Sequence, residues 1–354
     1  MGQEVHTDQV AAADVKRQAS LHEFDLCGIA PAAAHPQLAF LRDWLDRGFA
    51  GEMDYIHRSA ERRSDVRHVM PSARTVICLG TLYNTERPLS TDNTDPGQAA
   101  IARYAWGDDY HAVVGRRLDG LLEWLRTQAG PGLEARAYVD TGPVQERVYA
   151  QQAGLGWIGK NTCLINPELG SWVFLAEIIC NLELDVDPPA VDQCGCCTRC
   201  LDSCPTGALV DAHVLDSTRC LSYLTIELKG SIPADARGAV GEHAYGCDIC
   251  QDVCPWNFAS TARSENSAWL PRTGLDRPRL LDLWLRTDDE LRTLLKGSAM
   301  KRAGVRRFRR NLAVSIGNSG DPAAVEALAT SAGETCADPM VREHVTWALE
   351  KLGA

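Results

Sequence analysis

The chain has 354 residues, of which 45% are hydrophobic, so it can bury a large core and divide into two or three domains. Its formal net charge of −11 disfavours indiscriminate binding to nucleic acid but still allows a local basic patch. The N-terminus is polar, and no run approaches the roughly 20 apolar residues that span a bilayer. We therefore expect a cytoplasmic protein with no membrane contact, in which the 14 cysteines are free to bind metal.

Helices and strands are predicted to alternate over the first 185 residues. Helical periodicity covers about residues 8–20, 37–47, 109–128 and 144–153. Apolar runs with β-branched residues predict strands at 75–80, 135–139 and 172–180. This alternation predicts an α/β sandwich, followed by a linker at 185–189.

Asp140 is the most notable carboxylate in this region, because it follows a predicted strand and precedes a Gly-Pro turn. Ligands collect at the carboxyl ends of strands in α/β sheets, but an aspartate here can equally cap the next helix. These two interpretations have even weight. Asp109 and His111 begin the 109–128 helix, where capping at the surface is the favoured role.

The segment from Gly154 to Asn161 matches G-x-G-x-x-G and nearly matches a phosphate-binding loop. It follows a helix rather than a strand, and Asn161 replaces the Ser or Thr that would bind magnesium. A nucleotide site is therefore disfavoured. The glycines more readily serve a tight helix exit and a close backbone approach.

Residues 186–265 contain two related cysteine runs. The first has the form C-x2-C-x2-C-x3-C-P, by which bacterial ferredoxins hold cubane iron–sulfur clusters, with ligands Cys194, Cys197, Cys200 and Cys204. The second run repeats the C-x2-C-x3-C-P ending, and its ligands are Cys220, Cys247, Cys250 and Cys254. Cys196 is out of register with this pattern and has no assigned role.

In two-cluster ferredoxins, the fourth cysteine of each run ligates the other cluster. One cluster is therefore predicted to be held by Cys194, Cys197, Cys200 and Cys254, and the other by Cys204, Cys220, Cys247 and Cys250. Paired C-x2-C units also form structural zinc sites, and disulfides are a weaker alternative. The two reciprocal Cys-Pro endings favour iron–sulfur clusters, which can supply two electrons to one reaction.

The C-terminal segment, 266–354, is predicted to be helical, with a near-repeat that relates 305–317 to 341–353. This pattern is typical of HEAT-like units, although it is shorter than their usual roughly 40–47 residues. The run from Lys296 to Arg310 is basic and contains no acidic residue. A solvated helix face is the usual explanation, but its arginines favour phosphate contact, with Arg306, Arg307, Arg309 and Arg310 as candidates.

Taken together, these stretches resemble the epoxyqueuosine reductase family. The resemblance is carried by residues 104–111, 139–147, 156–162 and 170–174 and by both cysteine runs through Asn257. It implies an α+β multidomain fold. The implied parts are an α/β cobalamin-binding domain at 1–185, a ferredoxin-like domain with two 4Fe–4S clusters at 186–265, and HEAT-like helices for tRNA contact at 266–354.

The resemblance also implies a reaction, in which epoxyqueuosine at the tRNA wobble position is reduced to queuosine at cobalamin. Asp140 would then be the proton donor, and burial beside the corrin is expected to keep it protonated near neutral pH. The implied corrin contacts are Arg63, Tyr104, Asp140, Ser222 and Thr225. The expected partners are tRNA carrying epoxyqueuosine and an unidentified low-potential electron donor, and the expected state is a monomer.

Three alternatives stay open at this point. One is a cobalamin- and cluster-dependent reductase of a small molecule, similar to reductive dehalogenases. The second is an electron carrier without a substrate of its own, which would have no use for a basic helix or a large α/β domain. The third is a tRNA-binding adaptor whose clusters are structural and which would show no corrin absorbance.

Overall fold

The computed structural model of the chain describes residues 10–92, 95–331 and 337–353. Its N-terminal part is built on a four-stranded sheet in the order β1-β2-β7-β4, in which every pair is antiparallel. The strands are β1 (Leu26–Pro31), β2 (Thr75–Leu82), β7 (Val173–Cys180) and β4 (Ala135–Tyr138). All eight residues of β2 are buried, as expected for a central apolar strand.

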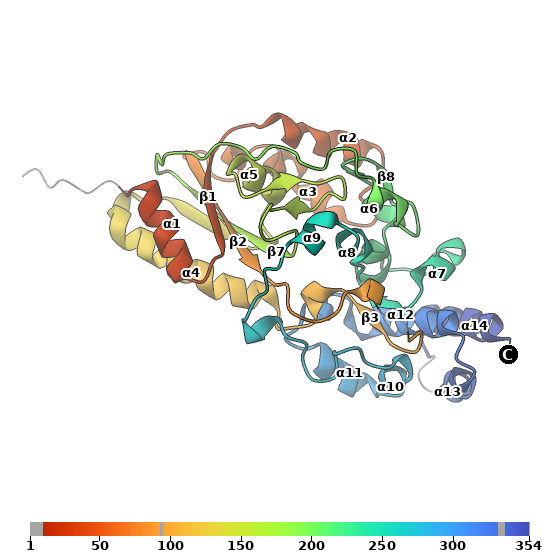
Figure 1. Cartoon of the computed structure of the whole chain (residues 1–354). Helices are drawn as coiled ribbons and strands as arrows, with labels where there is room; N and C mark the ends of the chain where they lie inside the picture. Colours follow the sequence, from red (N-terminus) through yellow and green to blue (C-terminus); the bar gives the residue numbers. More distant parts are fainter. Residues whose placement is uncertain (1–9, 93–94, 332–336, 354) are drawn as a thin grey trace, which may run out of the picture.

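Helices cover both faces of this sheet (Figure 1). One face packs against α1 (Ala12–Leu21) and α4 (Tyr110–Ala129). The other packs against α5 (Glu146–Gln152) and the segment that contains η1 (Pro36–Ala39), α2 (Phe40–Asp46), α3 (Asp54–Arg63) and η2 (Val66–His68). The layered arrangement is therefore as predicted, but the antiparallel sheet corrects the expected α/β class. Helical and strand periodicity do not specify strand direction, which depends on how each connection returns to the sheet.

The predicted strands at 75–80, 135–139 and 172–180 are confirmed, as are the predicted helices, with shifted ends. The start predicted for the first helix, at residue 8, lies outside the described residues. Strand β1 was not predicted, because Gly28 and Pro31 are residue types that usually interrupt regular secondary structure. Gly28 is required there: a Cβ would lie 2.1 Å from the carbonyl oxygen of Ala153.

The cysteine-rich segment is made of short elements between the sheet and the C-terminal helices (Figure 1). They are α6 (Arg199–Asp202), β8 (Leu209–Asp211), β9 (Val214–Leu215), η6 (Ser217–Arg219), η7 (Tyr223–Glu227), α7 (Ala234–Val240), β10 (His243–Tyr245), α8 (Ile249–Asp252) and α9 (Pro255–Ala259). Element η7 is a turn of π-helix directly after Cys220. Such turns are rare and are frequent at functional sites.

Shorter elements join the sheet to this segment. They are η3 (Ser90–Asp92), β3 (Ala100–Ile101), η4 (Arg103–Ala105), and the β5 (Trp157–Ile158) and β6 (Leu164–Ile165) hairpin, whereas η5 (Gly130–Gly132) connects α4 to β4. Strand β3 pairs in parallel with β10. Two segments that are distant in sequence are thereby tied together.

The C-terminal part is helical, as predicted. It contains η8 (Ser267–Trp269), α10 (Leu280–Trp284), α11 (Asp288–Leu295), η9 (Ala299–Arg302), α12 (Gly304–Ser319), α13 (Ala323–Ser331) and α14 (Pro339–Leu352). The near-repeat corresponds to α12 and α14, which approach closely at Gly317, where a Cβ would lie 2.9 Å from the Cα of Ala348. Among the described helices, none combines the length and apolar character needed to cross a membrane.

The hydrophobic core of these C-terminal helices also contains residues that precede position 266 in the chain. It includes Ile101 and Trp106 from the N-terminal part and Tyr245 from the cysteine-rich segment. The helices therefore complete a core that three parts of the chain share. Two short helical units cannot bury their own apolar faces, and the other parts of the chain cover them here.

Candidate active site

Asp140 lies two residues beyond β4, in a left-handed backbone conformation with φ of 59°. Its backbone N–H donates to Oε1 of Glu146 at 2.7 Å, which holds the turn against the first residue of α5. The N-cap of α5 is Gln145, so the interpretation of Asp140 as a helix cap is wrong. Aspartate is among the residues that tolerate this conformation, which turns its side chain away from the strand.

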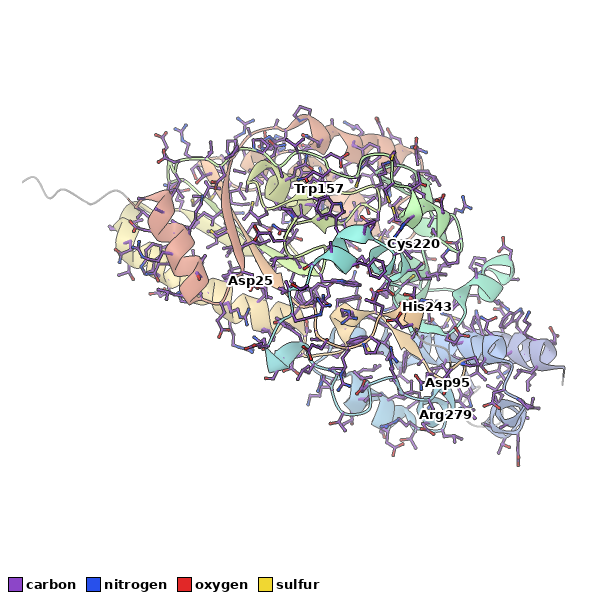
Figure 2. All side chains as sticks on the ribbon, in the orientation of Figure 1. Asp25, Asp95, Trp157, Cys220, His243 and Arg279 are labelled. Carbon is purple, nitrogen blue, oxygen red and sulfur yellow. The ribbon has the colours of Figure 1, made fainter. Side chains whose placement is uncertain are left out.

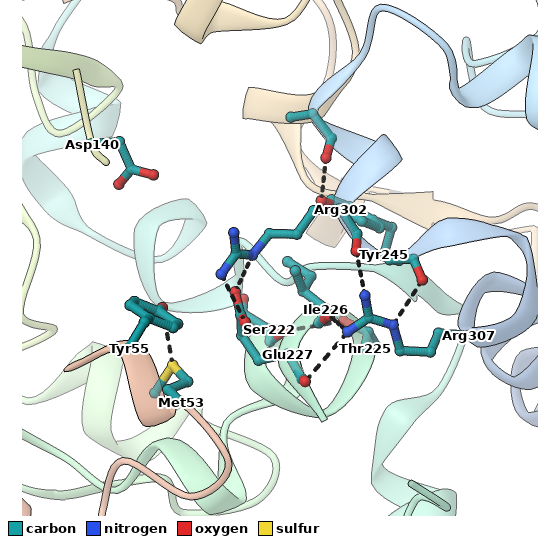
Figure 3. A network of polar contacts seen from close by, with 12 residues as sticks. Met53, Tyr55, Asp140, Ser222, Thr225, Ile226, Glu227, Tyr245, Arg302 and Arg307 are labelled. Atoms are coloured by element: carbon teal, nitrogen blue, oxygen red, sulfur yellow. Dashed lines mark hydrogen bonds and ion pairs between the residues drawn. The ribbon is translucent and has the colours of Figure 1, made fainter. Parts of the chain in front are cut away.

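The Asp140 side chain is 56% exposed, although protein surrounds it on most sides. It therefore lies in a hollow rather than on a convex surface. Asp140, Tyr55 from α3 and Arg302 from η9 act electrostatically on one another, and Figure 3 shows these three side chains around one region. Ser222, which precedes η7, is drawn beside Glu227 in the same view. The hollow is thus bounded by all three parts of the chain.

His111 connects Asp140 to Asp109. Its Nε2 lies 3.3 Å from Oδ2 of Asp140, and its Nδ1 lies 2.8 Å from Oδ1 of Asp109. Asp109 also accepts the backbone N–H of His111 as the N-cap of α4, so the predicted cap is confirmed. The capping carboxylate therefore has a second effect, since it orients the imidazole toward Asp140.

These contacts determine where the proton resides. Burial raises the pKa of Asp140, but hydrogen bonds from His111 and Tyr110 outweigh it, and the pKa lies below its usual value. The hydrogen bond to Asp140 raises the pKa of His111, and the bond to Asp109 adds to this effect. The protein's own groups therefore favour ionised Asp140, and the expected protonation beside a corrin stays a prediction. Between these two groups, the opposite directions of the pKa shifts favour the proton on His111.

Two further carboxyl groups lie behind Asp140, and neither was identified from the sequence. Glu177 of β7 is 2% exposed, and burial raises its pKa well above the usual value, as does its neighbour Glu146. Burial also raises the pKa of Glu146 to about 7, with a further contribution from Asp140. Two carboxylates in contact at a buried position cannot both be ionised, so this pair retains a proton.

The residues predicted to contact the corrin occupy different positions. Ser222 faces the hollow (Figure 3). Tyr104 is half-buried and donates its hydroxyl to Tyr245 at 3.3 Å. Arg63 donates to the Val144 carbonyl at 2.7 Å, so it supports the loop after Asp140. Thr225 is fully buried, with its hydroxyl bonded to Leu221 and Gly246, so the expectation that its side chain contacts a corrin is corrected.

The predicted phosphate-binding arginines also separate into two groups. Arg309 and Arg310 are 3% and 0% exposed, and both guanidinium groups donate to main-chain carbonyls. The expectation that these two contact tRNA phosphates is therefore corrected. Arg306 is 56% exposed and pairs with Asp338 at 2.5 Å. Arg307 is half-buried and donates to the Ile226 carbonyl at 2.7 Å.

The carbonyl groups that Arg307 and Arg310 satisfy belong to the π-helical turn η7 and the residues after it. Arg310 donates to Leu224, Leu228 and Gly230, and Asn311 donates to Thr225. A π-helical turn leaves carbonyls without the partners of a regular helix. The basic side chains of α12 supply these partners. They therefore stabilise the segment after Cys220, which forms one wall of the hollow.

Arg302 is the basic residue that reaches the hollow itself. It makes two contacts to the Glu227 carboxylate, at 2.5 and 3.0 Å, and its guanidinium lies 5.4 Å from the ring centre of Tyr55. Its side chain is 51% exposed. Sequence reasoning assigned it only to the basic run. Its position follows from the packing of η9 against η7.

Electrostatic contacts connect several of the ligand cysteines within the predicted groups, and Cys250 also contacts Cys163, so the assignment of ligands to two clusters stays a prediction. Cys200 interacts electrostatically with Cys194 and Cys254. Cys247 interacts with Cys204 and Cys220, and Cys250 interacts with Cys247 and Cys220. Cys197 adjoins the first group through its N–H, which donates to the Cys194 carbonyl at 3.3 Å. Cys196 is exposed, as expected for a residue out of register.

The spacing within these groups bears on the zinc alternative. Within the described ranges, no three Cys, His, Asp or Glu side chains lie close enough to share a single metal ion. A structural zinc ion needs four ligands within about 2.3 Å of one point. A cubane cluster places its four thiolates further apart, because each one binds a different iron atom. Zinc and a cubane cluster thus require different thiolate spacings, and iron–sulfur clusters stay the predicted occupants of these two groups.

Comparison with known proteins gives matches over both regions. Residues 63–141 match the family model described as Epoxyqueuosine reductase QueG, DUF1730, and residues 193–257 match a 4Fe-4S double cluster binding domain. The epoxyqueuosine reductase of Pseudomonas aeruginosa is 41% identical over 93% of this chain and 91% of its own length. That of Escherichia coli is 38% identical over 87% of this chain and 81% of its own length.

Solved structures agree with these matches. A crystal structure of epoxyqueuosine reductase with an epoxyqueuosine-modified tRNA-Tyr stem loop has a TM-score of 0.86 and 29% identity, over 97% of this chain and 90% of that one. The Bacillus subtilis enzyme, described with its catalytic aspartate loop swung out of the active site, has a TM-score of 0.84 and 28% identity, over 97% and 90%. Fold, cysteine segment and sequence all lead to one conclusion: this chain belongs to the epoxyqueuosine reductase family.

Proposed function

We propose that this chain reduces the epoxide of epoxyqueuosine in tRNA to queuosine. The observation that carries the proposal is the placement of Asp140. It projects from a left-handed turn into a hollow that the double-cluster segment helps to bound, with its carboxylate against a proton-bearing histidine. Family membership supports the same reaction, as does the relative that was solved with an epoxyqueuosine-modified stem loop.

Cobalamin is the cofactor that we propose for the hollow. Its walls present an aromatic ring, a hydroxyl and a guanidinium group, from Tyr55, Ser222 and Arg302, of which the first and last are 39% and 51% exposed. Such exposure of large side chains at a concave position fits a large flat ring with amide groups at its rim. When bound, cobalamin would supply a strongly reducing cobalt centre. Ser222 and Tyr104 stay candidate contacts, and Arg63 is proposed to act through the Asp140 loop.

Loss of the epoxide oxygen as water consumes two electrons and two protons, and residues of the chain can supply the first of these protons to the departing oxygen. An epoxide oxygen leaves poorly as an alkoxide, and general acid catalysis typically contributes about 10²–10⁴-fold. His111 stores the proton in the absence of substrate, because Asp109 and Asp140 both stabilise its charged form. Asp140 stands between His111 and the hollow, so we propose that it passes this proton to the departing oxygen. The proton held by Glu146 and Glu177 lies on the opposite side of the same loop.

The electrons and the tRNA approach from other sides of the hollow. Two clusters that each carry one electron match the two electrons of the reduction. Of the predicted arginines, Arg306 remains exposed and is proposed to contact a tRNA phosphate, together with the nearby exposed Lys301. Arg302 lies deeper, beside the hollow, where a nucleotide would have to enter.

Asp140→Asn tests the proposal in protein purified anaerobically and supplied with cobalamin. We expect full iron content and an unchanged corrin spectrum, but at least about a hundredfold slower conversion of an epoxyqueuosine stem loop, the low end of acid catalysis. Asp119→Asn, an exposed change on α4, is the matched control and should convert normally. Near wild-type turnover by Asp140→Asn would show that the acid lies elsewhere. A wild-type protein with clusters but no corrin absorbance would favour the adaptor alternative.

A further inference from the structure

The glycine-rich stretch from Gly154 to Asn161 has no part in the function described so far. In the structure it forms the turn after α5 and the first half of the β5–β6 hairpin, and no helix begins there. The nucleotide-site interpretation therefore lacks its structural basis. Gly156 is needed for closure of the hairpin, because a Cβ there would lie 2.2 Å from the carbonyl oxygen of Ile165.

Three residues of this hairpin make polar contacts to the cluster-binding loops. Trp157 Nε1 donates to Sγ of Cys194 at 3.5 Å. Lys160 Nζ donates to the carbonyls of Gly195 at 2.7 Å and Cys197 at 3.0 Å. Asn161 Nδ2 donates to the carbonyl of Cys250 at 3.1 Å, so the hairpin touches both cysteine runs.

The contact between Trp157 and Cys194 lies in a small apolar cluster. Trp157, which Figure 2 labels, is 1% exposed. Cys254 is 7% exposed, and Ile165 and Trp256 pack with these two residues. Trp256 meets Trp157 edge-on, with ring centres 4.9 Å apart. In such surroundings an N–H dipole acts on a sulfur ligand with little screening by water.

We propose that Trp157 tunes the cluster held by Cys194, raising its reduction potential through the N–H···S bond. Reduction adds an electron, and the added negative charge spreads to the ligand sulfurs, where a hydrogen-bond donor stabilises it. The ammonium of Lys160 acts in the same direction. It bonds carbonyl oxygens rather than sulfur and is half-exposed, so water and salt screen its charge and its effect is smaller. The proposal depends on the double-cluster domain and is independent of the substrate.

The test is a redox titration of the full chain with both clusters, followed by electron paramagnetic resonance. Trp157→Phe keeps an aromatic ring but removes the N–H, and we expect the midpoint potential of one cluster to become more negative while the other stays unchanged. Trp256→Phe is the matched control, since it removes an indole from the same apolar cluster and should leave both potentials at their wild-type values. Lys160→Met should shift the same cluster in the same direction, by less than Trp157→Phe.

A measurement on the wild-type protein keeps the test independent of how the variants fold. In reduced protein labelled with ¹⁵N at the tryptophan indole, the bond should give a nitrogen hyperfine coupling at one cluster. Unchanged potentials in Trp157→Phe would overturn the proposal. Equal shifts in Trp157→Phe and Trp256→Phe would also overturn it, because packing alone would then explain the potential. Absence of the ¹⁵N coupling would have the same consequence.

Discussion

Replacement of Arg310 by Met should destabilise the protein without weakening its binding to tRNA. The guanidinium group is fully buried and donates to three main-chain carbonyls, those of Leu224, Leu228 and Gly230, at 2.6, 2.8 and 2.5 Å. Methionine fills a similar volume but donates no hydrogen bond. The carbonyls that follow Cys220 would then lose their partners in the part of the chain that bounds the hollow.

The size of the effect depends on which carbonyls water can reach. Leu224 is 1% exposed, so water could not replace the hydrogen bond to its carbonyl, and the free energy of unfolding should fall by about 1–3 kcal/mol. The carbonyls of Leu228 and Gly230 are nearer to solvent, so each lost hydrogen bond there should lower it by only about 0.5–1.5 kcal/mol. Burial lowers the pKa of Arg310 to about 9, so removing the charge also removes part of its desolvation cost. The expected net loss is about 2–4 kcal/mol.

Thermal unfolding of the cluster-loaded protein measures this loss, and the salt dependence of tRNA binding measures phosphate contact. Arg306→Met is the matched control on the same helix. Its side chain is 56% exposed, so it should change stability by no more than about 1 kcal/mol, yet it should reduce the salt slope by roughly one phosphate contact. A stable Arg310→Met protein with weaker, less salt-dependent tRNA binding would refute the structural role given to Arg310.

Two further predictions concern the clusters and the proton. Cys196→Ser should keep the full iron content because Cys196 is exposed, whereas Cys200→Ser should lose one cluster; iron loss in the first variant would contradict the assigned register. For the proton, contact with Asp140 raises the pKa of His111, so the charged imidazole persists below that pKa and is lost as pH rises through it. Turnover should therefore fall on the alkaline side. His111→Asn should move that limb to lower pH, and an unmoved limb in a pH–rate profile would exclude His111 as the proton store.

Features that depend on local spacing could be predicted from the sequence alone. Two-residue gaps place successive thiolates around one cluster, so the pattern of Cys194, Cys197 and Cys200 carries its chemistry in any fold that leaves the loop intact. The buried strand β2 and the long helix α4 were likewise predictable, because an apolar run and a 3.6-residue period are local signals. The resemblance of short motifs then identified the family.

Which side chains face one another depends on how distant segments pack in the fold. Residues 29 positions apart bring His111 to Asp140, and residues 37 positions apart bring Trp157 to Cys194. The basic run from Lys296 to Arg310 shows most clearly what sequence alone cannot predict. Arg306 and Arg310 lie one helical turn apart and look alike in sequence. Arg306 faces solvent, whereas the Arg310 guanidinium donates to a carbonyl of a π-helical turn more than 80 residues away. A guanidinium group can donate to a phosphate or to a carbonyl, so its role follows from what the fold places opposite it.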